Sequence, residues 1–217
     1  MISRRTLLGS AAGAGVLVLA PSVPAFAADT GKWTGNRSAN GWTIGSGAVR
    51  TYRIEGSKAS VALRQGPAAT VLLHVARRWH YEIAPLGTGE GTVAGHTTNR
   101  AVRAGFESNY LSGTAIALYA TAYPPGGSEK LWPYQEVIVR DILADCDGTV
   151  VWGGDLAPAT QSHFHLVAKP TDKALRRVAD RVDPSKPPER RSQLAGMVAD
   201  PASPARRALA GRVPRPR

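Results

Sequence analysis

The side chains in this sequence best suited to chemistry are imidazoles and phenols. His163 and His165 stand two residues apart in a predicted strand, so both should point to the same face of a sheet. Tyr110 and Tyr119 each supply a phenol, which can stack on a ligand or hydrogen-bond to it. Together these four side chains could bind a ligand, or move protons without a metal. Cys146 is the single cysteine, so neither a disulfide within the chain nor a cysteine-rich zinc site is expected.

The elements that must position these residues mix helices and strands. Apolar residues recur at three- and four-residue steps in two segments, which predicts helices at 66–84 and 133–143. The first of these carries Arg77, Arg78 and His80 on its wetter faces, and His74 within it is expected to pack or lie at the helix edge. Strands are predicted at residues 49–54, 59–63, 114–120, 150–152 and 163–167. Since the two types do not alternate regularly, the expected class is α+β.

The first 27 residues have the pattern of an export signal. Arg4 and Arg5 precede a short apolar stretch that ends in Ala25-Phe26-Ala27, which is typical of a twin-arginine signal and predicts a secreted protein. A membrane anchor is the alternative, but the apolar run falls short of the ~20 residues that a spanning helix needs. We therefore expect a leader over residues 28–67, a main domain over 68–168, and no membrane span after cleavage.

Residues 169–217 differ in composition from the rest of the chain. This segment holds 13 Lys and Arg against 5 Asp and Glu, and it is rich in proline and free of aromatic residues. Such a composition predicts a largely disordered tail, with a helix plausible at 171–182. The tail could bind anionic cell-wall polymers by long-range attraction, or serve as a solvated extension of no fixed role. Since residues 28–168 are nearly neutral, nucleic acid is not an expected partner.

Four segments taken together resemble a known family. They are Arg77-Arg-Trp-His-Tyr-Glu82, Ser108-Asn-x-x-Ser-Gly-Thr-Ala-Ile116, Trp152-Gly-Gly-Asp155 and His163-Phe164. In this order they resemble the D-alanyl-D-alanine carboxypeptidase and L-alanyl-D-glutamate endopeptidase family of zinc peptidases, over residues 68–167. The resemblance implies the Hedgehog/D-Ala-D-Ala-peptidase-like fold, with a central antiparallel sheet flanked by helices.

The resemblance also implies a zinc site, and this sequence departs from it. The family pattern Ser-x-His-x-x-Gly-x-Ala-x-Asp places its ligand histidine at Tyr110 and its ligand aspartate at Ala117. The general base falls at Thr160, and only the last ligand survives, as His163. Zinc chemistry needs three protein ligands and a base beside the bound water. We therefore expect no cofactor and no hydrolysis by the family mechanism.

Three hypotheses remain open for the cleft that the resemblance implies. A degenerate cleft could bind a wall peptide or another small ligand, with Arg77, Arg78 and Asp155 as further candidate binding residues. A repurposed enzyme could use Tyr110, Tyr119, His163 and His165 for a metal-free cyclisation or isomerisation. A peptidase with an unorthodox zinc site around His163 and His165 is the third. A deep, apolar pocket would favour the second hypothesis, because wall peptides are polar and extended.

Overall fold

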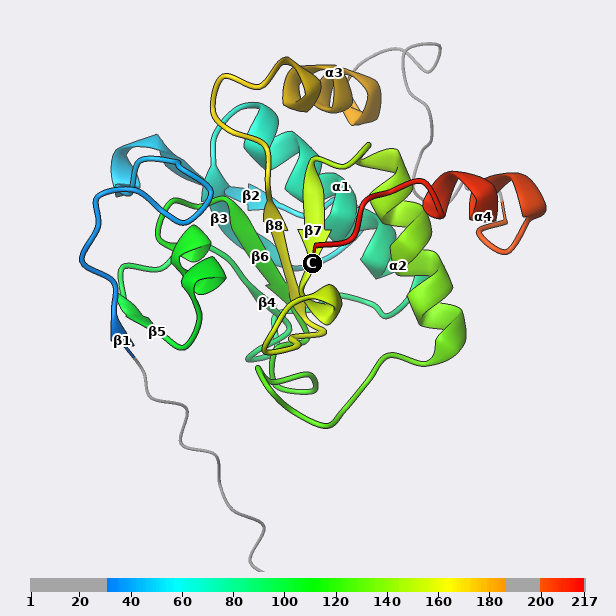
Figure 1. Ribbon diagram of the computed structural model, residues 1–217, viewed down its shortest axis with the longest axis horizontal. Helices are drawn as coiled ribbons and strands as arrows, with labels where there is room; N and C mark the ends of the chain where they lie inside the picture. Colours follow the sequence, from blue (N-terminus) through cyan, green and yellow to red (C-terminus); the bar gives the residue numbers. More distant parts are fainter. Residues whose placement is uncertain (1–30, 186–199, 217) are drawn as a thin grey trace, which may run out of the picture.

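A four-stranded antiparallel sheet forms the centre of the molecule, with strand order β4-β6-β8-β7. Its strands are β4 (Val93–Ala94), β6 (Ala115–Leu118), β8 (His163–Leu166) and β7 (Val150–Trp152). The computed structural model describes residues 31–185 and 200–216 (Figure 1). Two smaller antiparallel pairs accompany the sheet: β2 (Val49–Arg53) with β3 (Ser60–Arg64), and β1 (Gly31–Lys32) with β5 (Ala101–Val102). The signal predicted at residues 1–27 lies outside the described residues.

Helix α1 (Pro67–Glu82) packs on one face of this sheet. Pro67 occupies its first turn, where the missing N–H costs no hydrogen bond. The buried stripe of α1 includes Val71, Val75 and Trp79, and the Trp79 ring meets Phe164 of β8 edge to face at 5.9 Å. Helix α2 (Pro133–Asp145) packs beside α1, so the two long helices flank the sheet (Figure 1). The α+β class with a central antiparallel sheet and flanking helices is confirmed.

The opposite face of the sheet is covered by the short helix η2 (Gly105–Tyr110), which contacts β6 and β8. Side chains alternate along these two strands, so Phe164 and Leu166 enter the core on the α1 side while His163 and His165 face η2. In the register of the sheet, Ala117 lies opposite His163. The expectation that His163 and His165 share one face is thereby confirmed.

Residues 31–48 are tied firmly to the main domain. The Trp42 indole is buried and donates its Nε1–H to the carbonyl of Ala168 at 2.8 Å. The Asn40 side-chain amide donates to the carbonyl of Leu166 at 2.8 Å, and Ser38 bonds the Ser112 hydroxyl at 2.9 Å. Residues 31–48, the largely irregular first part of the leader predicted at 28–67, therefore belong to the folded unit.

The helix proposed at residues 171–182 is present, but the expectation of disorder in the rest of the tail is wrong for residues 204–210. Helix α3 (Lys173–Val182), close to the helix proposed at 171–182, packs against α1 and buries Leu175, Val178 and Val182. Helix α4 (Pro204–Ala210), which the sequence did not predict, packs beside α2 (Figure 1). A segment with too few apolar residues to form a core of its own can still be stable as a helix when it packs against a neighbouring helix. Residues 186–199 and 217 lie outside the described part of the chain.

Candidate functional site

A pocket of about 260 Å³ lies on the η2 side of the central sheet. Four residues singled out from the sequence line it together: Tyr110, Ala117, Thr160 and His163. Tyr110 closes η2, Ala117 and His163 face each other across β6 and β8, and Thr160 precedes β8. Segments more than 50 residues apart in sequence thus converge on one point. The other lining residues are Ala94, Gly95, Thr97, Phe106, Glu107, Ala120, Pro125 and Ser162.

A chain of three hydrogen-bonded side chains runs beneath this pocket. The Tyr110 hydroxyl lies 2.7 Å from His163 Nδ1, and His163 Nε2 lies 2.9 Å from His165 Nδ1. His163 has no exposed surface, and the Phe106 ring covers both imidazoles at centroid distances of 4.9 and 6.4 Å. Both ring nitrogens of His163 therefore have partners already, and among the three residues Tyr110 is the one that borders the pocket with its side chain only half-buried.

Burial keeps the three hydrogen-bonded side chains, Tyr110, His163 and His165, uncharged at neutral pH. It lowers the pKa of His163 well below its ordinary value, with His165 adding to the effect, and it lowers the pKa of His165 to about 4. Burial, assisted by the charge of Glu107, raises the pKa of the Tyr110 phenol. Because the phenol keeps its proton, we assign it as donor to His163 Nδ1, which leaves the His163 Nε2–H to donate to His165.

The zinc implied by the family resemblance does not fit these residues. His163 has no free ring nitrogen, Ala117 offers no donor atom, and a phenol with a raised pKa is a poor zinc ligand. Thr160, in the position of the general base, carries no carboxylate. Within residues 31–185 and 200–216, no group of three or more His, Cys, Asp or Glu side chains could hold a metal ion.

Two other candidates, Tyr119 and Asp155, lie away from the pocket. Tyr119 adopts a left-handed backbone conformation with φ of 56°, and its hydroxyl donates to the carbonyl of Pro85. Asp155 forms an ion pair with Arg140, whose guanidinium group stacks over the Trp152 ring at 4.8 Å. Neither side chain lines the pocket. Both instead hold their own loops in place.

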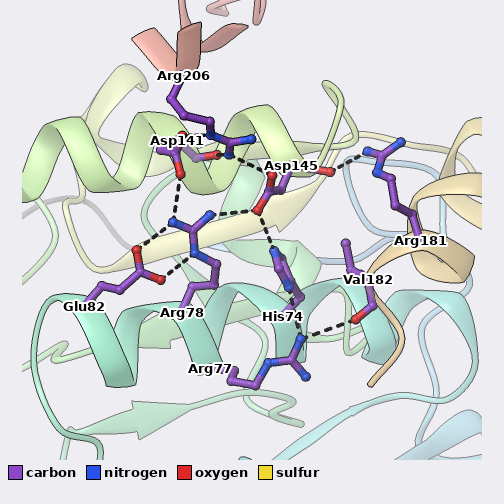
Figure 2. Close-up of polar contacts among 9 residues, drawn as sticks. All are labelled: His74, Arg77, Arg78, Glu82, Asp141, Asp145, Arg181, Val182 and Arg206. Atoms are coloured by element: carbon purple, nitrogen blue, oxygen red, sulfur yellow. Dashed lines mark hydrogen bonds and ion pairs between the residues drawn. The ribbon is translucent and has the colours of Figure 1, made fainter. Parts of the chain in front are cut away.

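Arg77 and Arg78 are buried, although the sequence predicted solvent-exposed faces for them. Arg78 donates to Asp145 at 2.7 Å and to Asp141 at 2.8 Å, and it also pairs with Glu82 (Figure 2). Arg77 donates to the carbonyl of Val182 at 3.3 Å, and therefore joins α1 to α3. These arginines hold helices together and are absent from the lining of the pocket.

The same network fixes the C-terminal helix α4 to α2. Arg206 reaches from α4 to both Asp141 and Asp145 (Figure 2). Burial opposes ionisation of Asp145, but the hydrogen bond from His74, the charge of Arg78 and the hydrogen bond from Arg206 lower its pKa to about 2. His74 donates its Nε2–H to Asp145 at 3.2 Å and accepts from Arg77 at Nδ1, so it is held as a neutral imidazole.

His74, His80 and His96 lie outside the pocket lining, at positions where they support the fold. Beyond His74 in the network, His80 accepts the backbone N–H of Leu86 at 2.7 Å and so terminates α1. Partial burial lowers the pKa of His96, whose backbone N–H donates to the carbonyl of Ala62. Cys146 is buried in the core, and burial raises the pKa of its thiol, with Asp145 adding to the effect. None of these groups is poised for chemistry.

Buried neutral histidines should make the fold sensitive to mild acid. The folded-state pKa of His165 lies near 4 and its unfolded value near 6.5, so below pH 6.5 the unfolded chain binds a proton that the folded chain does not. His74 and His163 act in the same direction. Stability is therefore fully present above about pH 6.5 and should fall as the pH drops toward 4, by up to ~1.4 kcal/mol per pH unit for each histidine.

Urea denaturation at pH 7, 5.5 and 4.5 measures this loss. In a His165→Asn variant, the free energy of unfolding should depend less steeply on pH, because the unfolded chain takes up one proton fewer. A free energy of unfolding that stays constant from pH 7 to 4.5 would contradict the buried, neutral state of these imidazoles.

Sequence reasoning missed Phe106 and Glu107 in the pocket, and Asp141, Asp145 and Arg206 in the network. The first two lie in a short 3-10 helix, where no apolar periodicity marks which side chains turn inward. Asp141 and Asp145 are four residues apart, a spacing that puts both on one face of a helix, but the helix was predicted to end at residue 143 and so left out Asp145. The sequence also does not identify the helix that faces them.

Comparison of the sequence with protein-family models, curated proteins and solved structures found no match. Within the described residues, none of the helices combines the length and the apolar character needed to cross a bilayer.

Proposed function

We propose that this protein is an exported, zinc-independent relative of the cell-wall D-Ala-D-Ala carboxypeptidases whose degenerate cleft binds a small ligand. The observation that carries the proposal is that positions 110, 117, 160 and 163 converge on one pocket. These are the positions that the resemblance assigns to the zinc ligands and the general base. Their convergence supports the proposal, because the resemblance requires these four positions to meet in one cleft.

Binding is favoured over hydrolysis by the state of the retained histidine. His163 is buried, and both of its ring nitrogens are hydrogen-bonded within the chain. The residues at positions 110, 117 and 163 do not form a zinc site that could activate a water, and position 160 supplies no carboxylate to take its proton. The pocket is therefore better suited to holding a ligand than to cleaving a peptide bond.

A small ligand is favoured over an extended wall peptide by the pocket lining. Ala94, Gly95, Ala117, Ala120 and Pro125 leave an apolar space of about 260 Å³, somewhat below the ~300–1,000 Å³ typical of drug-sized ligand sites. An extended polar peptide would leave its backbone groups unpaired against such a surface.

The second candidate is a metal-free enzyme, which is favoured by the apolar lining of the pocket and by the hydrogen-bonded side chains of Tyr110, His163 and His165. A proton taken up at the Tyr110 oxygen could pass through His163 to His165 by successive hydrogen-bond exchange. With the pKa of His165 near 4, however, that acceptor is a weak base at neutral pH. The three hydrogen-bonded side chains are better suited to presenting the Tyr110 hydroxyl to a ligand as a hydrogen-bonding group.

The absence of peptidase activity is the first test of this proposal. The full chain is incubated with a stem pentapeptide ending in D-Ala-D-Ala and excess zinc, and released D-alanine is measured. No release above the rate of a His163→Ala variant is expected, because the residues around position 163 cannot activate water. Zinc-dependent release that is lost in His163→Ala would overturn the proposal in favour of an unorthodox peptidase.

A further inference from the structure

The pocket contains one carboxylate and no side chain of opposite charge. Glu107 lines it, and no lysine or arginine does so among its described lining residues. The structure gives the Glu107 carboxylate one hydrogen bond, from the backbone N–H of Arg103 to Oε2 at 2.7 Å. A carboxylate has about four lone-pair sites, so Glu107 keeps capacity to accept from a ligand. Glu107 is therefore the one acidic side chain, without a basic counterpart, among the described residues that line the pocket.

Aromatic surface adds to the attraction for a cation. The rings of Phe106 and Tyr110 both border the pocket, and their faces carry partial negative charge. A ligand ammonium group between these rings and Glu107 would meet attraction on each side. A ligand carboxylate there would instead be desolvated next to a like charge, without any neighbouring cation to compensate.

The floor of the pocket limits the rest of the ligand. Ala117 and Thr160 are buried there, whereas Ala94 and Thr97 form an exposed rim. Small side chains at the floor leave room for a compact apolar group and supply few hydrogen-bonding partners to it. The ligand that fits is thus apolar at one end and positively charged at the other.

We infer that the pocket binds small apolar amines in their ammonium form, through Glu107 and the rings of Phe106 and Tyr110, and that it discriminates against carboxylates. This inference rests on the proposed function of the pocket as a binding site. It differs from it in naming the charge of the ligand, which is opposite to that of a peptide C-terminus.

Three probes of equal ring size separate the possible charges: benzylamine, benzamide and benzoate. Binding to the full chain is followed by the NMR shift of the methyl group of Ala120, a lining residue present in every variant, at pH 7. The expected order is benzylamine, then benzamide, then benzoate, with at least about tenfold between the first and last, which corresponds to ~1.4 kcal/mol.

Matched variants show whether Glu107 causes that order. Glutamine at position 107 keeps an acceptor for the Arg103 N–H, so Glu107→Gln should fold and should reduce the advantage of benzylamine over benzamide to about twofold or less. Glu129→Gln removes the same charge from an exposed loop and should leave the order unchanged. Ala117→Leu, which fills the floor, should abolish binding of every probe.

The outcomes distinguish the two proposals. If benzoate binds as tightly as benzylamine, or the preference persists in Glu107→Gln, the charge assignment is wrong and the pocket remains a binding site. If no probe shifts the Ala120 methyl group, or Ala117→Leu binds as the natural chain does, both the charge assignment and the binding site are wrong.

Discussion

Replacing Arg78 with methionine should lower the free energy of unfolding by about 3–5 kcal/mol, because it removes one partner from a buried ion-pair network. The Arg78 side chain has no exposed surface, and its guanidinium group contacts Asp141, Asp145 and Glu82. Methionine keeps most of the apolar stem but leaves the two aspartates to Arg206 and His74. Since small domains are stable by only about 5–15 kcal/mol, this is a large share of the total.

Urea denaturation of the variant at pH 7 provides the measurement. Arg176→Met on α3 serves as the matched control, since this side chain is exposed, and its effect should stay within about 0.5 kcal/mol. Arg78→Lys should recover only part of the loss, because an ammonium group cannot bond several carboxylates in one plane. A loss below about 1 kcal/mol in Arg78→Met would contradict the structural role assigned to the network.

The second large effect is a gain of zinc binding in the double variant Tyr110→His/Ala117→Asp. These two positions flank His163, since Ala117 lies opposite it in the sheet and the Tyr110 hydroxyl bonds its Nδ1. The substitutions remove the phenol that occupies His163 and complete a His, Asp, His set, which is a catalytic type of zinc site. Zinc affinity should rise at least about 100-fold over the natural chain, or ~2.7 kcal/mol.

Isothermal titration with zinc measures this gain, and circular dichroism shows whether the variant is folded. Adding His163→Ala to the double variant should abolish the new site, because two ligands do not hold zinc firmly. A folded double variant without added affinity would mean that the three positions are not arranged as the resemblance implies.

Local sequence patterns predicted most elements of the fold correctly. The apolar stripe of α1 and the buried run of β6 are signals contained within one segment, and both appear close to the predicted bounds. The features that were not predicted depend on contacts with elements distant in the sequence. Arg78 is buried because α2 presents two aspartates to it, and α4 is ordered against α2 although it has no buried residue of its own.

The residues of the candidate site were predictable in part, and the errors in that prediction have local structural causes. Strand alternation would place residues 117 and 119 on one face, but the positive φ of Tyr119 ends that alternation and turns its side chain toward Pro85. Asp155 forms an ion pair with Arg140 of α2, and no local pattern in the sequence indicates that pairing. Glu107 was missed because a short 3-10 turn carries no periodic signal.

The zinc content of the natural full chain tests the central claim most directly. The protein is exchanged against excess zinc, separated from free metal, and measured by elemental analysis before and after chelator. The account predicts no stoichiometric zinc and an unchanged unfolding curve in chelator, because His163 already has both ring nitrogens engaged. About one equivalent of zinc, lost in His163→Ala, would contradict it.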